Sequence, residues 1–154
     1  MSTRRYLFYR LLLGVFLSAV LFTSHQALCE EQADGKTIVY YFHRTVRCPS
    51  CNQIEYLTKT AVQLGFSDEI EAGKMELAII NVDEPSYAHF IDDYRLESQS
   101  VILSRVIDGK QQRWRNLDKV WDLFHQDTEF IEYVQKEIRA FTSPVKSSRI
   151  THEP

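Results

Sequence analysis

One pair of cysteines restricts the fold of this chain more than any other feature. Cys48 and Cys51 stand three residues apart in the segment RCPSC. The preceding run, KTIVYYFH, is long enough for a buried strand but too short for a helix. After the cysteines, helical spacing connects the apolar residues Ile54, Leu57, Ala61 and Leu64, and Gly65 supplies a stop. The sequence therefore predicts that both cysteines lie where a strand turns into a helix.

Three further segments have the pattern of strands. MELAIINVD, residues 75–83, reads as a second core strand, and SVILSRVI reads as a third. Asp108 and Gly109 form a two-residue hairpin signal, so KQQRWRN is predicted to return as a partner strand with Trp114 facing the core. Together with the first strand, these segments predict one sheet.

Helix-like stretches separate and follow these strands. Asp83 or Ser86 is predicted to cap a short helix whose apolar side carries Tyr87, Phe90, Ile91 and Tyr94. Residues 118–124 predict another short helix. Asp127 is then predicted to cap a longer helix with apolar positions at Phe130, Ile131, Val134, Ile138 and Phe141. This last helix is expected to cover the sheet.

The first residues follow the pattern of a secretory signal. Basic RRYLFYR precedes the apolar run LLLGVFLSAVLF, and the polar exit TSHQALC follows. The run is shorter than the roughly 20 residues that span a bilayer, so we expect cleavage rather than a permanent anchor. We expect a signal peptide over 1–29, a linker over 30–36, the folded domain over 37–141 and a flexible tail over 142–154. An uncleaved signal would instead tether the protein to a membrane.

Charge and composition exclude several classes of function. Removal of residues 1–29 takes away three arginines and no acid, and changes the formal net charge from −3 to −6. The remaining charges are mixed in sign without a basic block, so no nucleic-acid partner is expected. No Gly-rich phosphate loop appears, and we expect no cofactor beyond a redox-active disulfide. The exported protein is expected in the periplasm or another extracytoplasmic compartment.

The placement of the cysteine pair favours redox chemistry over a structural role. A disulfide between Cys48 and Cys51 closes a loop too short to constrain much unfolded chain. At a helix N-terminus, backbone N–H groups stabilise a thiolate, and Pro49 suits the first turn because it needs no donor there. Cys48 is therefore the predicted attacking sulfur and Cys51 the resolving thiol. Arg47 and Arg44 add positive charge, which favours the ionised form of Cys48.

His43, at the end of the first predicted strand, has two interpretations. As a proton shuttle or third metal ligand it would join Cys48 and Cys51, because imidazole titrates near neutral pH and soft ions prefer thiolate ligands. As an ordinary strand-end histidine it would lie on the surface or pack against neighbours. The alternative metal site is therefore Cys48, Cys51 and His43, with Cu(I) or trivalent arsenic as the ion.

The order strand, CxxC, helix, strand, helix, hairpin, helix resembles the thioredoxin fold, in which a core strand ends in Asn-x-Asp, as in INVDEP here. The resemblance implies an α/β fold, a three-layer α/β/α sandwich with a mixed central sheet. More narrowly, YYFHRTVRCPSC, INVDEP, SVILSRV and NLDKVW resemble a small thioredoxin-like family that is labelled as an arsenic-operon subunit of a nitrophenyl-compound nitroreductase.

The resemblance also implies a substrate groove, in which this chain departs from thioredoxins. The groove would include Pro49 and Ser50 beside the disulfide, and Gln99 and Ser100 opposite. Ser100 occupies the position where thioredoxins carry a cis-proline, which shapes the groove and keeps metals off the cysteines. The serine weakens the expectation of a general disulfide reductase and strengthens that of metal binding.

Three functions follow from these residues. The leading prediction is a thiol-disulfide oxidoreductase or electron-transfer protein whose partner is a protein thiol or disulfide. The second is a protein that binds a soft metal or metalloid. The third is a non-catalytic subunit of a redox complex that uses the fold as a docking surface.

Overall fold

The fold is built around a mixed sheet of four strands. The computed structural model describes residues 35–143, so the predicted signal peptide and most of the predicted linker and tail lie outside the described residues. Strand β1 (Lys36–His43) pairs in parallel with β2 (Met75–Asn81) and antiparallel with β3 (Ser100–Ile107). Strand β4 (Lys110–Asn116) pairs antiparallel with β3, which gives the order β2-β1-β3-β4.

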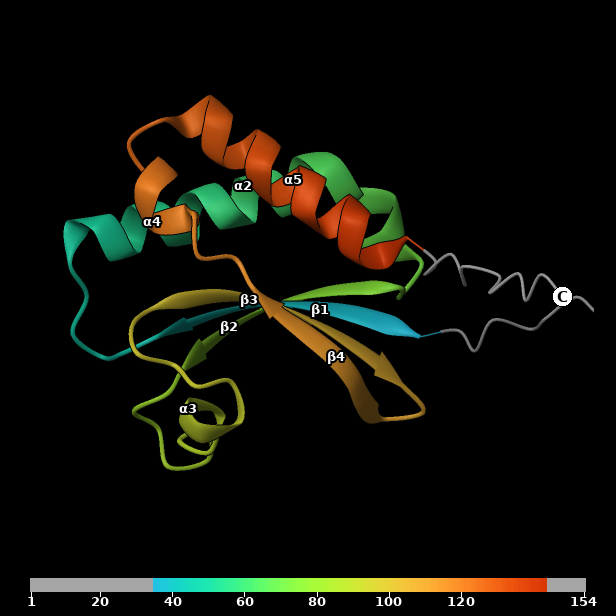
Figure 1. The fold of residues 1–154 in the computed structure, drawn as a ribbon, viewed down its shortest axis with the longest axis horizontal. Coiled ribbons are helices and arrows are strands. Elements are labelled where there is room, and N and C mark those ends of the chain that lie inside the picture. The colour runs from blue at the N-terminus through green and yellow to red at the C-terminus, as the bar shows by residue number, and fades with distance from the viewer. Residues whose placement is uncertain (1–34, 144–154) are drawn as a thin grey trace, which may run out of the picture. The chain divides into compact units, whose positions relative to one another are not determined.

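Helices lie on both faces of this sheet. Figure 1 shows α2 (Pro49–Glu71), α4 (Val120–Leu123) and α5 (Asp127–Thr142) on one face, and the short helix α3 (Phe90–Asp93) on the other. The parallel β1–β2 pair requires a crossover, which α2 supplies. The arrangement confirms the predicted thioredoxin-like α/β sandwich with a mixed central sheet. Within residues 35–143, no helix is both long and apolar enough to span a membrane.

Alternating side chains of the sheet divide the core into two clusters. Val39 and Tyr41 of β1 point toward α2 and α5, where the larger cluster includes Ile54, Leu57, Phe130, Val134 and Ile138. Phe42 of the same strand belongs to the smaller cluster, which also contains Val82, Tyr94, Leu96 and Ile102. The period of two along the strand thus buries residues of β1 on both faces, which explains its almost continuous apolar sequence.

Helix α2 is longer than the sequence predicts. Phe66, directly after Gly65, leaves helical geometry at φ −147° and ψ 26°, so the predicted stop coincides with a kink, and a further helical piece continues to Glu71. Leu64, predicted on the apolar side, is 73% exposed, whereas Val62 is fully buried. The predicted spacing is correct for Ile54, Leu57 and Ala61 and wrong for Leu64, where Val62 takes the core position.

The hairpin prediction is confirmed, but Trp114 of β4 and the strand β2 are less buried than expected. Asp108 and Gly109 have positive φ values of 51° and 71°, as a tight two-residue turn requires. Trp114 is 36% exposed instead of core-facing, and its ring meets that of Tyr94 edge-on. The second predicted core strand is β2, which forms an edge of the described sheet and is mostly half-buried.

The predicted helix caps differ from those observed. Helix α3 spans only four residues and follows His89 without a side-chain cap, so neither Asp83 nor Ser86 caps it. Asp127 lies inside the first turn of α5 rather than at its cap, which is Gln126. A carboxylate in the first turn still interacts favourably with the helix dipole. Asp127 therefore marks the start of α5, one residue after the actual cap.

Candidate active site

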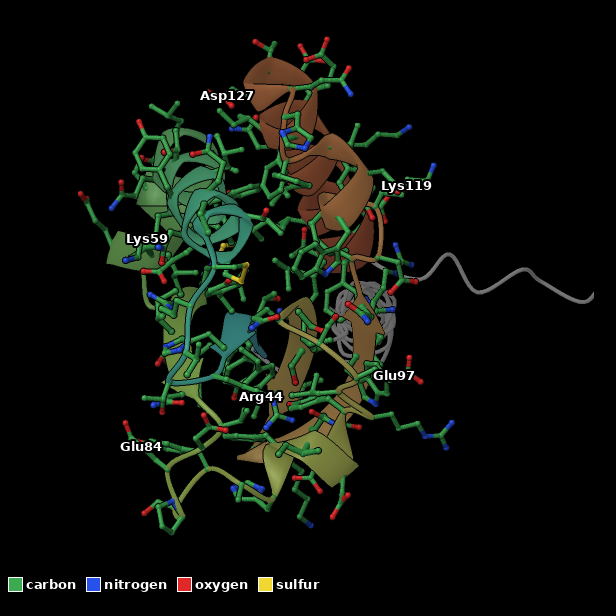
Figure 2. The ribbon with its side chains drawn as sticks, turned by 90° about the vertical axis from the view of Figure 1, so that its left-hand side faces the viewer. Arg44, Lys59, Glu84, Glu97, Lys119 and Asp127 are labelled. Atoms are coloured by element: carbon green, nitrogen blue, oxygen red, sulfur yellow. A yellow bond between two sulfur atoms is a disulfide. The ribbon has the colours of Figure 1, made fainter. Side chains whose placement is uncertain are left out.

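The cysteine pair forms a disulfide at the N-terminus of α2. Figure 2 shows this bond in yellow at the start of the helix, and the Cα atoms of Cys48 and Cys51 are 5.1 Å apart. Cys48 is the extended N-cap residue, and Pro49 begins the helix. The Sγ atom of Cys48 accepts the backbone N–H of Cys51 at 3.2 Å. A helix-terminal N–H group is therefore already directed at this sulfur, in the geometry that stabilises a thiolate.

The two sulfur-bearing residues differ in accessibility. Cys48 is exposed, whereas Cys51 is 2% exposed. Behind Cys51, the hydroxyl of buried Tyr41 donates to the Cys51 carbonyl at 2.6 Å. Burial raises the pKa of Tyr41 to about 12, despite the opposing effect of Arg47, so the hydroxyl keeps its proton and remains a donor. Cys48 is therefore the solvent-accessible residue of the pair, and Cys51 is buried.

Arg47 is held by an acid on the helix. Its Nη2 donates to Oε2 of Glu55, whose other oxygen accepts Lys59 Nζ at 2.5 Å. Burial by itself raises the pKa of Glu55, but the hydrogen bonds from Lys59 and Arg47 outweigh it, and the pKa falls below the ordinary glutamate value. We call Arg47, Glu55 and Lys59 the Glu55 cluster. It places a carboxylate one helical turn beyond Cys51.

The loop that precedes the cysteines is fastened to the turn after β2. Oδ2 of Asp83 accepts the backbone N–H of Thr45 at 2.8 Å, and Oδ1 accepts Nη1 of Arg44 at 3.2 Å. Asn81 adds a bond from Nδ2 to the Thr45 hydroxyl. Arg44, predicted to favour the thiolate, therefore pairs with an acid, and Asp83 anchors the loop instead of capping α3.

We expect Asp83→Ala to loosen this loop at neutral pH. The hydrogen bond from the Thr45 backbone is the main cause of a lowered Asp83 pKa, so the anchor is present above the ordinary aspartate pKa and is lost as pH falls through the lower folded value. Amide hydrogen exchange at Thr45 should accelerate by about fivefold at pH 7. The difference from wild type should disappear in acid. Glu84→Ala, which removes the exposed neighbouring acid, is the control. If it accelerates amide exchange at Thr45 as much as Asp83→Ala does, Asp83 does not anchor the loop.

His43 lies at the end of β1, as the sequence predicts, and its ring is directed toward the backbone. Its Nδ1 lies 2.9 Å from the Arg44 carbonyl oxygen, and its ring stacks on Tyr41. In the described part of the chain, no three His, Cys, Asp or Glu side chains gather closely enough to hold a metal ion. The alternative ligand set of Cys48, Cys51 and His43 is therefore not assembled in this disulfide-bonded structure.

The other predicted groove residues lie at the start of β3. Ser100 is buried and pairs with Phe42 near the end of β1, and its hydroxyl donates to the Ser98 carbonyl. The Gln99 carbonyl accepts Nε1 of Trp121 at 3.0 Å, which ties this segment to α4. Pro49 is exposed and Ser50 is half-buried at the start of α2. A cavity of about 310 Å³ adjoins this segment, lined in part by Arg95, Ser98, Ser100, Asn116, Asp118 and Trp121.

Sequence analysis missed three contributors to the site. Tyr41 looked like one more apolar residue of a strand, and Trp121 looked like part of a short amphipathic helix. Glu55 carried the one readable signal, because its position four residues after Cys51 places it on the same side of the helix. Its pairing with Arg47 joins a loop to a helix, and no local spacing rule anticipates such a contact.

A comparison with solved structures finds proteins of low similarity to this chain. A protein described as a malarial protein is 14% identical, with 66% of this chain and 96% of that chain covered and a TM-score of 0.40. A thioredoxin from Thermus thermophilus, solved in solution, is 18% identical to this chain. The match covers 77% of this chain and 85% of the thioredoxin, with a TM-score of 0.46. No family model and no curated protein matches this chain.

Proposed function

We propose that the protein is a thiol-disulfide oxidoreductase that exchanges electrons with a protein partner through Cys48 and Cys51. The observation that carries the proposal is the pairing of an exposed Cys48, whose sulfur accepts a helix-terminal N–H, with a buried Cys51. A purely structural disulfide does not require that one of its cysteines be accessible to solvent. In disulfide exchange, an accessible cysteine attacks the partner first, and a protected cysteine then resolves the mixed disulfide. The exposed Cys48 and the buried Cys51 fit these two roles.

The proposed reaction proceeds in two exchanges. In the reduced protein, the Cys48 thiolate attacks one sulfur of a partner disulfide, forms a mixed disulfide and expels the partner's other sulfur as a thiolate. Cys51 then loses its proton to that thiolate or to solvent and attacks Cys48 Sγ. This step releases the second partner thiolate and forms the Cys48–Cys51 disulfide. Two electrons pass from the protein to the partner, and a dithiol of another protein returns them by the reverse sequence.

The remaining expectations become parts of this proposal. We propose that the protein acts after export, in the periplasm or a similar oxidising compartment, as its first residues suggest. The partner is a protein that carries a disulfide or a dithiol. A larger redox enzyme of which this chain is a subunit fits that description, and the resemblance to the arsenic-operon nitroreductase subunits favours such a partner. We propose no cofactor beyond the cysteine pair.

Redox titration of the Cys48–Cys51 pair tests the function directly. The protein is equilibrated in glutathione or dithiothreitol buffers of known ratio, and free thiols are counted after acid quenching. We expect one reversible two-electron transition at a potential between about −270 and −120 mV, the range of known oxidoreductases. A pair that stays oxidised well below about −300 mV would behave as a structural clip and would refute the proposal.

A further inference from the structure

We propose that Glu55 is a positioning residue that sets the redox potential of the Cys48–Cys51 pair by holding the Arg47 guanidinium against α2. This inference rests on the proposed function. Arg47 is the direct neighbour of Cys48, and a free guanidinium at this position would stabilise the Cys48 thiolate. In the structure, the Arg47 guanidinium instead pairs with the carboxylate of Glu55, which lies eight residues further along the chain.

The contacts of Arg47 fix its guanidinium away from solvent. The side chain is only 27% exposed, and that of Glu55 is 13% exposed. One guanidinium nitrogen donates to Glu55, and the group lies over the Tyr41 ring with 5.8 Å between its carbon and the ring centroid. The buried Nε of Arg47 has no hydrogen-bond partner among the described residues. The arginine thus leaves one donor unsatisfied while it keeps its bond to Glu55.

The same contacts connect the Glu55 cluster to Cys51. The Tyr41 ring beneath Arg47 carries the hydroxyl that donates to the Cys51 carbonyl. Lys59 approaches Glu55 from a more exposed position, since its side chain is 43% exposed. Its charge is therefore better screened by solvent than that of Arg47. Glu55 and Arg47 are the partly buried pair of the cluster, and their charges offset each other beside the cysteines.

The charge balance determines the direction of the effect. A disulfide carries no charge, whereas the reduced pair carries a thiolate at Cys48 when it is active. Neutralising Glu55 leaves the Arg47 charge without its main counter-charge, so the reduced form gains stability relative to the disulfide. The potential should then become less negative. The pH profile of Cys48 alkylation should move to lower pH, because a larger fraction of the thiol is ionised at each pH.

A double-mutant cycle tests this inference, with wild type, Glu55→Gln, Arg47→Met and the double variant titrated against glutathione. We expect Glu55→Gln to favour the reduced form by about tenfold, which corresponds to about 30 mV. Adding Arg47→Met to Glu55→Gln should reverse that shift. Arg47→Met alone should change the equilibrium by less than about twofold, because Lys59 remains paired with the Glu55 carboxylate. Iodoacetamide alkylation of Cys48 against pH gives an independent readout, and far-UV circular dichroism checks the fold.

Glu69→Gln is the matched control, because it removes one negative charge from an exposed position of the same helix. It should leave the potential unchanged. If Glu55→Gln shifts the potential equally with and without Arg47, Glu55 acts directly and the positioning role is wrong. A tenfold shift of the equilibrium in Arg47→Met alone would also overturn the positioning role of Glu55. Because Arg47→Met retains Glu55, this test remains possible if Glu55→Gln does not fold. A wild-type protein without a reversible transition would instead refute the proposed function.

Discussion

Replacement of Cys48 by serine is expected to abolish disulfide exchange. Serine keeps the size of the side chain but lacks a nucleophile that ionises near neutral pH, and the remaining thiol of Cys51 is buried away from a partner disulfide. The rate of reduction of a peptide disulfide by the reduced protein should fall by at least about a thousandfold. The measurement is stopped-flow or quenched-flow exchange at pH 7, followed by separation of the peptide products.

Cys51→Ser should give a different result from Cys48→Ser. The exposed Cys48 still attacks, but the buried second thiol is missing, so the mixed disulfide cannot be resolved from within the protein. Mass spectrometry should therefore detect a one-to-one covalent adduct with the peptide in Cys51→Ser. No adduct should form in Cys48→Ser, and Ser67→Ala, at an exposed site near the far end of α2, should exchange as wild type does. Similar adducts in both cysteine variants would contradict the assigned order of attack.

The features of the site that sequence predicts are those set by neighbours along the chain. Strand β1 matches the predicted run KTIVYYFH residue for residue, and the Cys48 sulfur lies at the helix N-terminus as expected. Both depend on local rules: the length of an apolar run, and the preference for proline in a first helical turn. The hairpin at Asp108 and Gly109 is predictable for the same reason, since its backbone requires residues that tolerate positive φ.

Features set by distant contacts escape local rules. Arg47 was predicted to stabilise a thiolate because it adjoins Cys48, but its charge is taken up by Glu55. Asp83 was predicted as a cap because a short helix follows it, but its carboxylate accepts the Thr45 amide 38 residues away. In both cases an acid that local spacing assigns to a helix bonds the loop before the cysteines. Sequence analysis therefore placed Cys48 at the helix N-terminus correctly and missed the ion pairs around it.

The prediction that Leu64 belongs to the core is wrong, and this error leads to a stability prediction. Leu57 and Leu64 lie two helical turns apart, so the helical spacing of apolar residues predicts that both are buried. In the structure, Leu57 is 1% exposed within the main cluster, whereas Leu64 is 73% exposed just before the kink at Phe66. The same substitution in the same helix should therefore have very different effects at the two positions.

Leu57→Ala is expected to lower the free energy of unfolding by about 3 kcal/mol, because it removes buried apolar contacts and leaves a cavity between α2 and the sheet. Leu64→Ala is expected to change it by less than about 0.5 kcal/mol, since the leucine is mostly solvated and alanine favours helix. Urea denaturation of the oxidised proteins, with the disulfide intact in every sample, measures both. Equal losses at the two positions would mean that Leu64 is buried in solution, by a different course of α2 after Gly65 or by another molecule on that face.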